Sequence, residues 1–161
     1  MFARLCRNYA SHTQLRFANV ALTRHGESAT LYSVEEDDDS TGLASFDRAL
    51  LLRQLPIGAR VVELSVPAVS FYALIREHDV TRLDLLQIDA EGYDAEIIRM
   101  VDFSKLRPSV VHYEHRHLSQ TDRESCENEL AAHGYRIHLG VVDTTAVLLV
   151  RDADSPLLQA I

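Results

Sequence analysis

The sequence predicts a single domain of the α/β class, residues 1–161, in which strands and helices alternate and an antiparallel hairpin forms the C-terminal edge. An apolar stretch of strand length, residues 83–88, ends abruptly in Asp89-Ala90-Glu91-Gly92, and a helical spacing of apolar residues begins at Tyr93. A second strand pattern covers residues 109–115, and two more strand patterns follow it near the C-terminus. This order is typical of βα units followed by a hairpin.

Six elements are predicted before the central strand. Pro56 ends one of the helices, and Ser70 is suited to the N-cap of another. The acidic run at 35–39, with residues 40–42 after it, has the composition of an exposed loop. The six elements are a helix at 2–12, strands at 15–22, 29–34 and 60–66, and helices at 44–55 and 70–78.

The C-terminal half is predicted to contain the parallel part of the sheet. Strands 83–89 and 109–115 flank a helix, so we expect them to be adjacent and parallel, with their carboxyl ends on one side. Thr121-Asp122-Arg123-Glu124 has the capping-box pattern, and the helix that it starts would end at Gly134. Residues 135–141 and 146–150 are expected to form the terminal antiparallel pair.

The composition excludes several classes of partner. With 24 Asp plus Glu against 16 Lys plus Arg, the net charge is -8, which argues against binding to nucleic acid or an anionic membrane surface. The apolar runs are far shorter than a membrane span and the N-terminus has no secretory pattern, so we expect a cytoplasmic protein. Cys6 and Cys126 have no metal-binding spacing and are expected to be reduced core thiols.

Four side chains with acid–base chemistry are predicted to meet at the carboxyl ends of the two parallel strands. Asp89 and Glu91 follow the first strand, and His112 and Glu114 lie on the same side of the second. A carboxylate or imidazole in such a crevice can orient a substrate and accept its proton. The sequence therefore predicts that Asp89, Glu91, His112 and Glu114 are catalytic residues.

Other interpretations of these residues remain open at this point. Asp89 would instead accept turn N–H groups, while Glu91 and Asp94 would favour the positive end of the helix dipole. His115 and His117 are expected to be surface residues just past the strand. A divalent metal on the four candidate residues, as in a small metal-dependent hydrolase, is a minor alternative, because no HxH or HExxH spacing lies on a single predicted element and no metal ligand is assigned.

The segment 89–94, Asp-Ala-Glu-Gly-Tyr-Asp, with the apolar strand before it, resembles the hallmark segment of the FkbM-type methyltransferases, which use S-adenosylmethionine. Gln87 stands where the family usually has Lys, and Asp94 where it usually has Glu. Weaker similarity follows the same order over roughly residues 1–150. It comprises Asn19-Val20-Ala21-Leu22, residues 66–74 and the strand that ends at Glu114.

The resemblance implies a Rossmann-like methyltransferase sheet and O-methyl transfer to a sugar or another small polar acceptor. Asn19, Val20 and Ala21 would contact the adenine side of S-adenosylmethionine. Such enzymes carry a Gly-rich turn after the first strand, yet the six glycines form no GxG pair. By the resemblance, residues 2–12 match the helix after the second strand, so the domain would lack its first two strands and cofactor loop.

Two consequences of these missing elements are expected. The chain alone would bind S-adenosylmethionine very weakly, and a second copy of the chain or an N-terminal partner segment would supply the remaining contacts. A non-catalytic remnant, or a binding or oligomerising module that kept the sheet but lost the cofactor loop, is the main alternative function.

Overall fold

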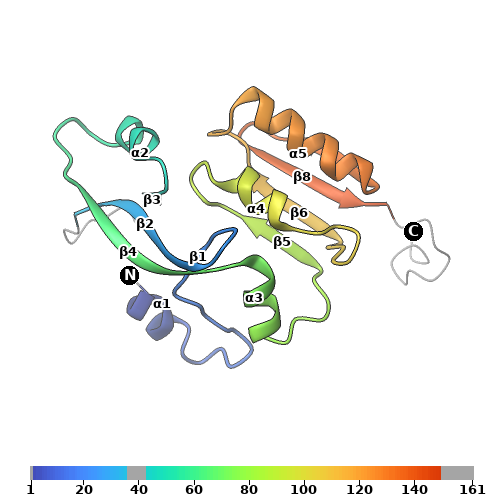
Figure 1. The fold of residues 1–161 in the computed structure, drawn as a ribbon, viewed down its shortest axis with the longest axis horizontal. Coiled ribbons are helices and arrows are strands. Elements are labelled where there is room, and N and C mark those ends of the chain that lie inside the picture. The colour runs from blue at the N-terminus through green and yellow to red at the C-terminus, as the bar shows by residue number, and fades with distance from the viewer. Residues whose placement is uncertain (1, 36–42, 150–161) are drawn as a thin grey trace. The chain divides into compact units, whose positions relative to one another are not determined.

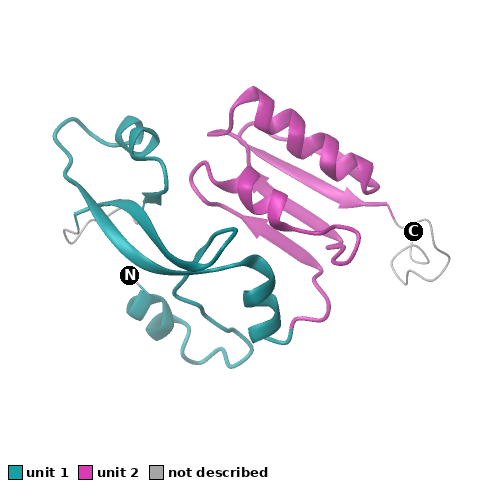
Figure 2. Cartoon of the chain, viewed as in Figure 1, with its two compact units in different colours: residues 1–79 teal, residues 80–161 magenta. Residues whose placement is uncertain are grey.

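The computed structural model describes residues 2–35 and 43–149, which divide into two compact units, residues 1–79 and residues 80–161 (Figure 2). Each unit contains one four-stranded sheet with its own helices. The predicted acidic loop, apart from Glu35, lies outside the described residues. This division does not test the prediction of a single domain, because it does not show whether either unit folds on its own.

The sheet of the first unit has the strand order β1-β4-β2-β3. Strand β2 pairs antiparallel with β4 from Glu27↔Ala68 to Val34↔Val61, and β1 is parallel to β4. This confirms strands near 29–34 and 60–66. The elements of this unit are α1 (Phe2–Asn8), β1 (Ala21–Leu22), β2 (Glu27–Val34), β3 (Ala44–Ser45), α2 (Arg48–Gln54), β4 (Val61–Val69) and α3 (Phe71–Glu77).

Side-chain caps set where two of these helices begin. Asp47 caps α2, with its Oδ1 2.8 Å from the backbone nitrogen of Ala49. Ser70 caps α3, accepting the N–H of Ala73 at 3.2 Å, as the sequence predicts. The cap at Asp47 explains why the helix predicted from residue 44 starts only at Arg48.

Two predicted elements of the first unit are shorter than expected. Of the strand predicted at 15–22, only Ala21 and Leu22 pair with β4. An apolar pattern becomes a strand only where a neighbouring strand takes its backbone groups, and residues 15–20 have no such ladder. The helix predicted to reach residue 12 ends at Asn8, and none of its residues is buried, so little packing supports a longer helix.

The second unit contains the predicted parallel strands. Its sheet has the order β5-β6-β8-β7, and β5 and β6 pair in parallel from Leu85↔Val110 to Ile88↔Tyr113. Strands β8 and β7 add the predicted antiparallel edge. The elements are β5 (Leu85–Ile88), α4 (Asp94–Met100), β6 (Val110–Glu114), α5 (Gln120–Ala132), β7 (Tyr135–Leu139) and β8 (Asp143–Leu148).

Helices α4 and α5 contact each other and lie over one face of this sheet (Figure 1). Beneath them, Val111, Tyr113 and Ala146 are fully buried, while Ile98 and Leu130 fill the helix side of the core. Because side chains alternate along a strand, His112 and Glu114 point to the opposite face from Tyr113. Val111 and Tyr113 are thus used in the core, and His112 and Glu114 are the β6 side chains that can take part in a site.

The start of α5 differs from the prediction. Ser119 caps the helix by accepting the N–H of Asp122 at 3.1 Å, and α5 begins at Gln120. The predicted capping box at residues 121–124 was therefore placed two residues too late, because Ser119 offers the same hydroxyl chemistry earlier in the chain. The predicted end is confirmed, since His133 is the C-cap and Gly134 has φ 88°.

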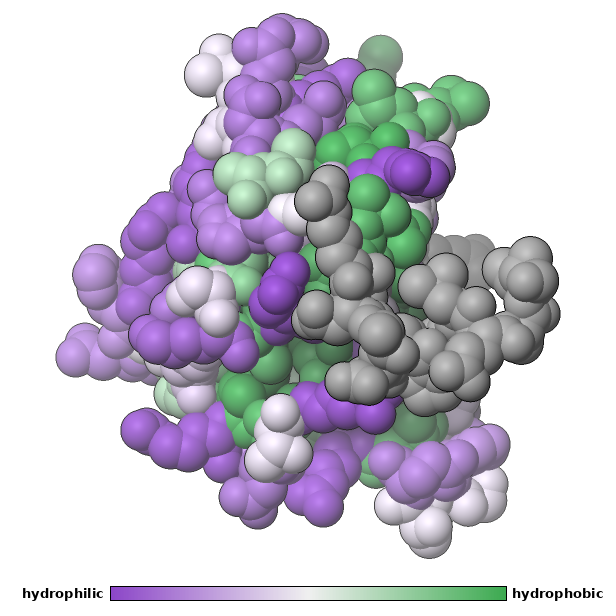
Figure 3. All heavy atoms as spheres, turned by 90° about the vertical axis from the view of Figure 1, so that its right-hand side faces the viewer, coloured by the Kyte–Doolittle hydropathy of each residue, from purple (hydrophilic) through white to green (hydrophobic). Residues whose placement is uncertain are grey.

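On the face seen in Figure 3, hydrophilic residues cover much of the surface, and hydrophobic residues are visible between them. Several large apolar side chains of the second unit are exposed, among them Leu85, Leu139 and Val141. Within residues 2–35 and 43–149, no helix has both the length and the apolar character needed to cross a bilayer. The α/β class predicted from sequence is confirmed, as a mixed α/β fold with two four-stranded sheets.

Candidate functional site

The turn that joins β5 to α4 carries two residues in the left-handed region, Glu91 with φ 47° and Gly92 with φ 91°. A non-glycine residue seldom adopts this conformation, so the turn needs support from outside. Asp94 supplies it by reaching back, with its Oδ2 3.3 Å from the nitrogen of Ala90. The N–H of Ala90 therefore bonds to Asp94, and Asp89 remains exposed at the carboxyl end of β5.

Asp94 also connects this turn to the neighbouring strand. Its side chain is fully buried, and its Oδ1 accepts the backbone N–H of Glu114 at 3.2 Å. Burial raises the pKa of Asp94, while the N–H groups of Ala90 and Glu114 and the backbone of Asp94 itself lower it, and the charge of Asp89 raises it. Asp94 thus places the turn beside the end of β6.

Glu91, Glu114 and His117 form what we call the carboxylate–histidine cluster. The Nε2 atom of His117 lies 3.6 Å from Oε2 of Glu114 and 3.8 Å from Oε2 of Glu91. All three side chains are largely shielded from solvent, with exposed fractions of 15% for His117, 18% for Glu114 and 21% for Glu91. The cluster is therefore a partly buried group of two carboxylates and one imidazole.

His117 was not among the predicted site residues, and its expected position on the surface is wrong. After β6 the chain turns back, because the N–H groups of His115 and Arg116 both bond to the carbonyl of Val142. Leu118, only 7% exposed, anchors the segment that follows. The sequence signals were this apolar residue and the spacing of three between Glu114 and His117.

The charges at the site are mostly of one sign. Burial raises the pKa of Glu114, His117 lowers it, and the negative charges of Glu91, Asp89 and Asp94 raise it further. Asp89, Glu91 and Glu114 are therefore near one another, as predicted. A group of carboxylates of this kind attracts a hydrogen-bond donor, such as an O–H or N–H group, or a cation.

His112 lies two residues before Glu114 on the same side of β6. Its Nδ1 is 2.9 Å from Oγ1 of Thr145, the residue opposite it on β8. The cluster of potential metal ligands found among the described residues does not include His112. The structure therefore places this predicted catalytic residue against β8, beside the cluster and not within it.

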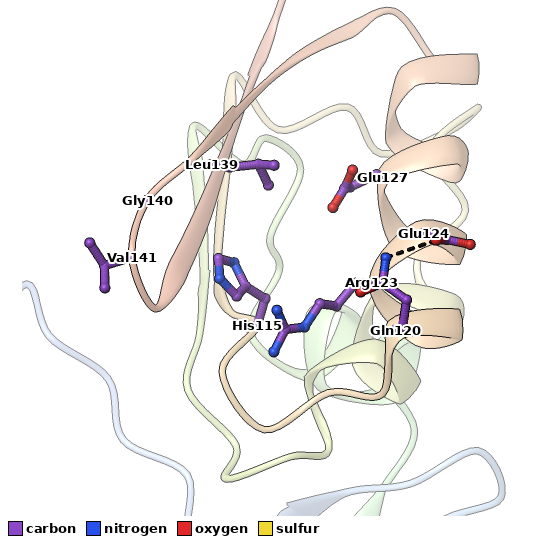
Figure 4. Close-up of a pocket in the computed structure, with 8 residues that line it drawn as sticks. All are labelled: His115, Gln120, Arg123, Glu124, Glu127, Leu139, Gly140 and Val141. Atoms are coloured by element: carbon purple, nitrogen blue, oxygen red, sulfur yellow. Dashed lines mark hydrogen bonds between the residues drawn. The ribbon is translucent and has the colours of Figure 1, made fainter.

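A second feature of this unit is a pocket of about 400 Å³ between α5 and the β7–β8 turn (Figure 4). His115, only 6% exposed, lines it with Nδ1 bonded to Oγ1 of Thr144 at 2.8 Å, so its expected surface position is also wrong. The guanidinium of Arg123 extends toward His115 in this view, while its Nε donates to the carbonyl of Leu118 at 3.3 Å. The pocket is thus lined by His115, two residues before His117 in the chain.

The residues predicted to hold the adenine lie in the first unit, at the start of β1. Asn19 is exposed, Val20 is half-buried, and Ala21 is 8% exposed within the strand. Their placement neither brings them to the cluster nor separates them from it, because the two units are described independently. Their contact with a cofactor remains a prediction.

Four of the glycines differ in how closely protein atoms approach them. A Cβ would meet nothing within 4 Å at Gly58, and only ordinary contacts at Gly26 and Gly134. At Gly140 it would come within 3.0 Å of the carbonyl oxygen of Asp143, which belongs to the β7–β8 turn. The six glycines of the sequence form no GxG pair, so the chain does not show the Gly-rich turn that usually holds the cofactor in this fold.

Carboxylates stand at the ends of two adjacent parallel strands of this α/β protein, the position at which open α/β sheets usually bind ligands. The sequence model of the methyltransferase FkbM domain matches residues 2–137, and the chain belongs to this family. Methyl transfer is accordingly the general class of activity, and families of this class use S-adenosylmethionine in general. No curated relative and no solved structure matched the chain.

Proposed function

We propose that this chain provides the acceptor-binding part of an S-adenosylmethionine-dependent O-methyltransferase that acts on a sugar or another small polar acceptor. One observation carries the proposal: in a member of the FkbM family, Asp89, Glu91 and Glu114 gather at the carboxyl ends of β5 and β6. A hydroxyl group placed there would meet acceptors for its proton and for its hydrogen bonds.

Each carboxylate has a role in this proposal. Asp89 is exposed at the end of β5, so it is accessible to accept the proton of an incoming hydroxyl. Glu91 and Glu114 are held by the turn and by β6, and they orient the acceptor through hydrogen bonds. When bound by the assembled protein, S-adenosylmethionine would supply the methyl group, and Asp89 would accept the proton that the acceptor oxygen loses.

The wider architecture belongs to the proposal as well. The order β5-β6-β8-β7 supports assignment of the second sheet to the C-terminal part of a Rossmann-like methyltransferase sheet. The remaining contacts to the methyl donor would come from a second copy of the chain or from an N-terminal partner segment. We further propose a cytoplasmic protein without nucleic-acid or membrane partners, in keeping with its net charge of -8 and its two free cysteines.

The test is methyl transfer from tritiated S-adenosylmethionine to a panel of sugars, with Asp89→Asn compared to the unaltered chain. The chain is assayed alone and together with an added polypeptide that carries a Gly-rich cofactor segment. Loss of a general base should lower turnover by about 10²-fold or more. Asp84→Asn is the matched control, because Asp84 is also exposed but precedes β5 and pairs with Arg82. Equal turnover in both variants would exclude Asp89 as the base.

A different result would favour the alternative function. If the chain with the added polypeptide binds S-adenosylmethionine but methylates no sugar, the proposed acceptor class is wrong. If this mixture binds no S-adenosylmethionine at all, the result favours a binding or oligomerising module. Calorimetry with S-adenosylmethionine distinguishes these two outcomes before any acceptor is known.

A further inference from the structure

We propose that the carboxylate–histidine cluster, Glu91, Glu114 and His117, binds one divalent transition-metal cation. One ligand atom of each residue lies within 4.8 Å of the other two, and all belong to the second unit. The ligands come from three places in the fold: the β5–α4 turn, the end of β6 and the segment after it. The proposed site is thus formed by the same backbone arrangement that places the acceptor-binding carboxylates.

The three groups lie nearly as close together as ligands around one shared ion, with every pair of ligand atoms within 4.8 Å. The distances from Nε2 of His117 to the carboxylate oxygens, 3.6 Å and 3.8 Å, exceed the usual hydrogen-bond length. Donors that bind one ion at roughly 2.0–2.2 Å in a tetrahedral arrangement lie about 3.3–3.6 Å apart. Small side-chain movements would therefore bring all three donors into coordination range.

Charge balance points the same way. Glu91 and Glu114 are both less than a quarter exposed, and Asp89 and Asp94 add negative charge around Glu114. A divalent cation bound there would bring two positive charges beside the two carboxylates of the cluster, and opposite charges attract strongly where water is partly excluded.

The donor set selects the class of cation. Two carboxylate oxygens and one imidazole nitrogen suit Zn²⁺ and Mn²⁺, whereas Mg²⁺ and Ca²⁺ prefer ligand sets made only of oxygen. Three protein ligands also leave at least one coordination position open, which is the pattern of catalytic zinc sites. An acceptor hydroxyl bound at that position would lose its proton more easily, a consequence that rests on the proposed function.

Support for His117 is built into the fold. The N–H groups of His115 and Arg116, the two residues before His117, both donate to the carbonyl of Val142. These bonds attach the segment to the β7–β8 turn. Arg123 donates from Nη2 to the carbonyl of Arg116 at 3.2 Å, next to His117 in the chain. Arg123 also donates from Nε to the carbonyl of Leu118 at 3.3 Å, on the other side of His117. A ligand whose backbone is held on both sides loses little freedom when it binds an ion.

The experiment titrates Mn²⁺ into the whole chain, without a polyhistidine tag, and follows free Mn²⁺ by electron paramagnetic resonance. We expect one saturable site per chain that Zn²⁺ displaces. His117→Gln and Glu114→Gln should each weaken binding by at least about tenfold, the lower end of the effect of losing even an outer-shell partner. Circular dichroism checks that both variants are folded.

The matched control is His133→Gln. His133 lies 3.6 Å from a carboxylate oxygen of Glu129 on α5, a His–Glu spacing like that of the cluster but without a third ligand among the described residues. This variant should bind Mn²⁺ like the unaltered chain. Absence of saturable Mn²⁺ and Zn²⁺ binding, or equal affinity in His117→Gln, would overturn the proposal.

The binding measurement requires neither S-adenosylmethionine nor a methyl acceptor. Metal binding without methyl transfer would therefore support the cation site while the proposed function failed. Methyl transfer by a metal-free protein that shows no saturable binding of either ion would support the proposed function and overturn the cation site.

Discussion

The carboxylate of Asp94 accepts the backbone N–H of Glu114, with Oδ1 3.2 Å from that nitrogen. Through its other oxygen the same side chain accepts the N–H of Ala90. One buried carboxylate thus joins the β5–α4 turn to the end of β6, and these two segments carry all the acidic residues of the candidate site. The geometry of the site depends on this residue, although Asp94 itself faces the core.

Asp94→Ala is expected to destabilise the second unit. It would leave two backbone N–H groups without their side-chain acceptor, and each unsatisfied buried donor costs about 1–3 kcal/mol. Because burial disfavours the charged carboxylate, part of this loss is offset, and we expect a net loss on the order of 2 kcal/mol. Urea unfolding followed by circular dichroism measures the change.

Asp84→Ala is the control for that measurement, because Asp84 is exposed and its ion pair with Arg82 lies at the surface. Amide hydrogen exchange gives a local readout. The amides of Ala90 and Glu114 should exchange faster in Asp94→Ala than in Asp84→Ala. Equal exchange in the two variants would show that Asp94 does not hold the turn.

The isolated chain is expected to bind S-adenosylmethionine very weakly or not at all. The six glycines of the sequence form no GxG turn, the element that usually holds the cofactor in this fold. Only residues near Asn19 would remain to contact the adenine. Isothermal titration calorimetry checks this, and a micromolar dissociation constant would contradict the expectation, since that affinity corresponds to about 8 kcal/mol of binding free energy.

The two cysteines should differ in reactivity toward N-ethylmaleimide. Cys126 is 1% exposed and burial raises the pKa of its thiol to about 11, so very little thiolate is present near neutral pH. Cys6 lies on α1 and is only half-buried. Mass spectrometry of the native protein should find Cys6 modified first, and both sites modified after denaturation. Early modification of Cys126 would mean that α5 opens readily.

The stability of the second unit is expected to fall at alkaline pH. The pKa of Cys126 rises from an ordinary 9.0 to about 11 on folding, so the unfolded chain loses this proton before the folded one. The contribution is complete below pH 9 and disappears as pH increases through 11. At roughly 1.4 kcal/mol per pKa unit, the upper bound is about 2–3 kcal/mol.

Burial also raises the pKa of Tyr135 to about 12, so the loss of stability of the second unit continues to higher pH. Urea unfolding at about pH 8 and about pH 10.5 measures the effect of Cys126. The fall should be smaller in Cys126→Ala, which lacks the titrating thiol. A fall of the same size in both proteins would assign it to other groups.

The sequence by itself determined the parallel β5–β6 pair, the terminal hairpin and the nearness of Asp89, Glu91 and Glu114. These features follow from local patterns, because apolar runs of strand length and right-handed crossovers fix where strand ends lie. Family membership was also readable from the segment at 89–94, and the match over residues 2–137 confirms it.

Only the tertiary structure decided the other features of the site. His117 enters the cluster because two N–H groups of its segment bond to Val142, about 25 residues further along the chain, and no local pattern encodes such a contact. His112 turns to Thr145 for the same reason, since its partner is set by the β6–β8 register. Strand 15–22 shortened to Ala21–Leu22 because a strand exists only where a neighbour pairs with it.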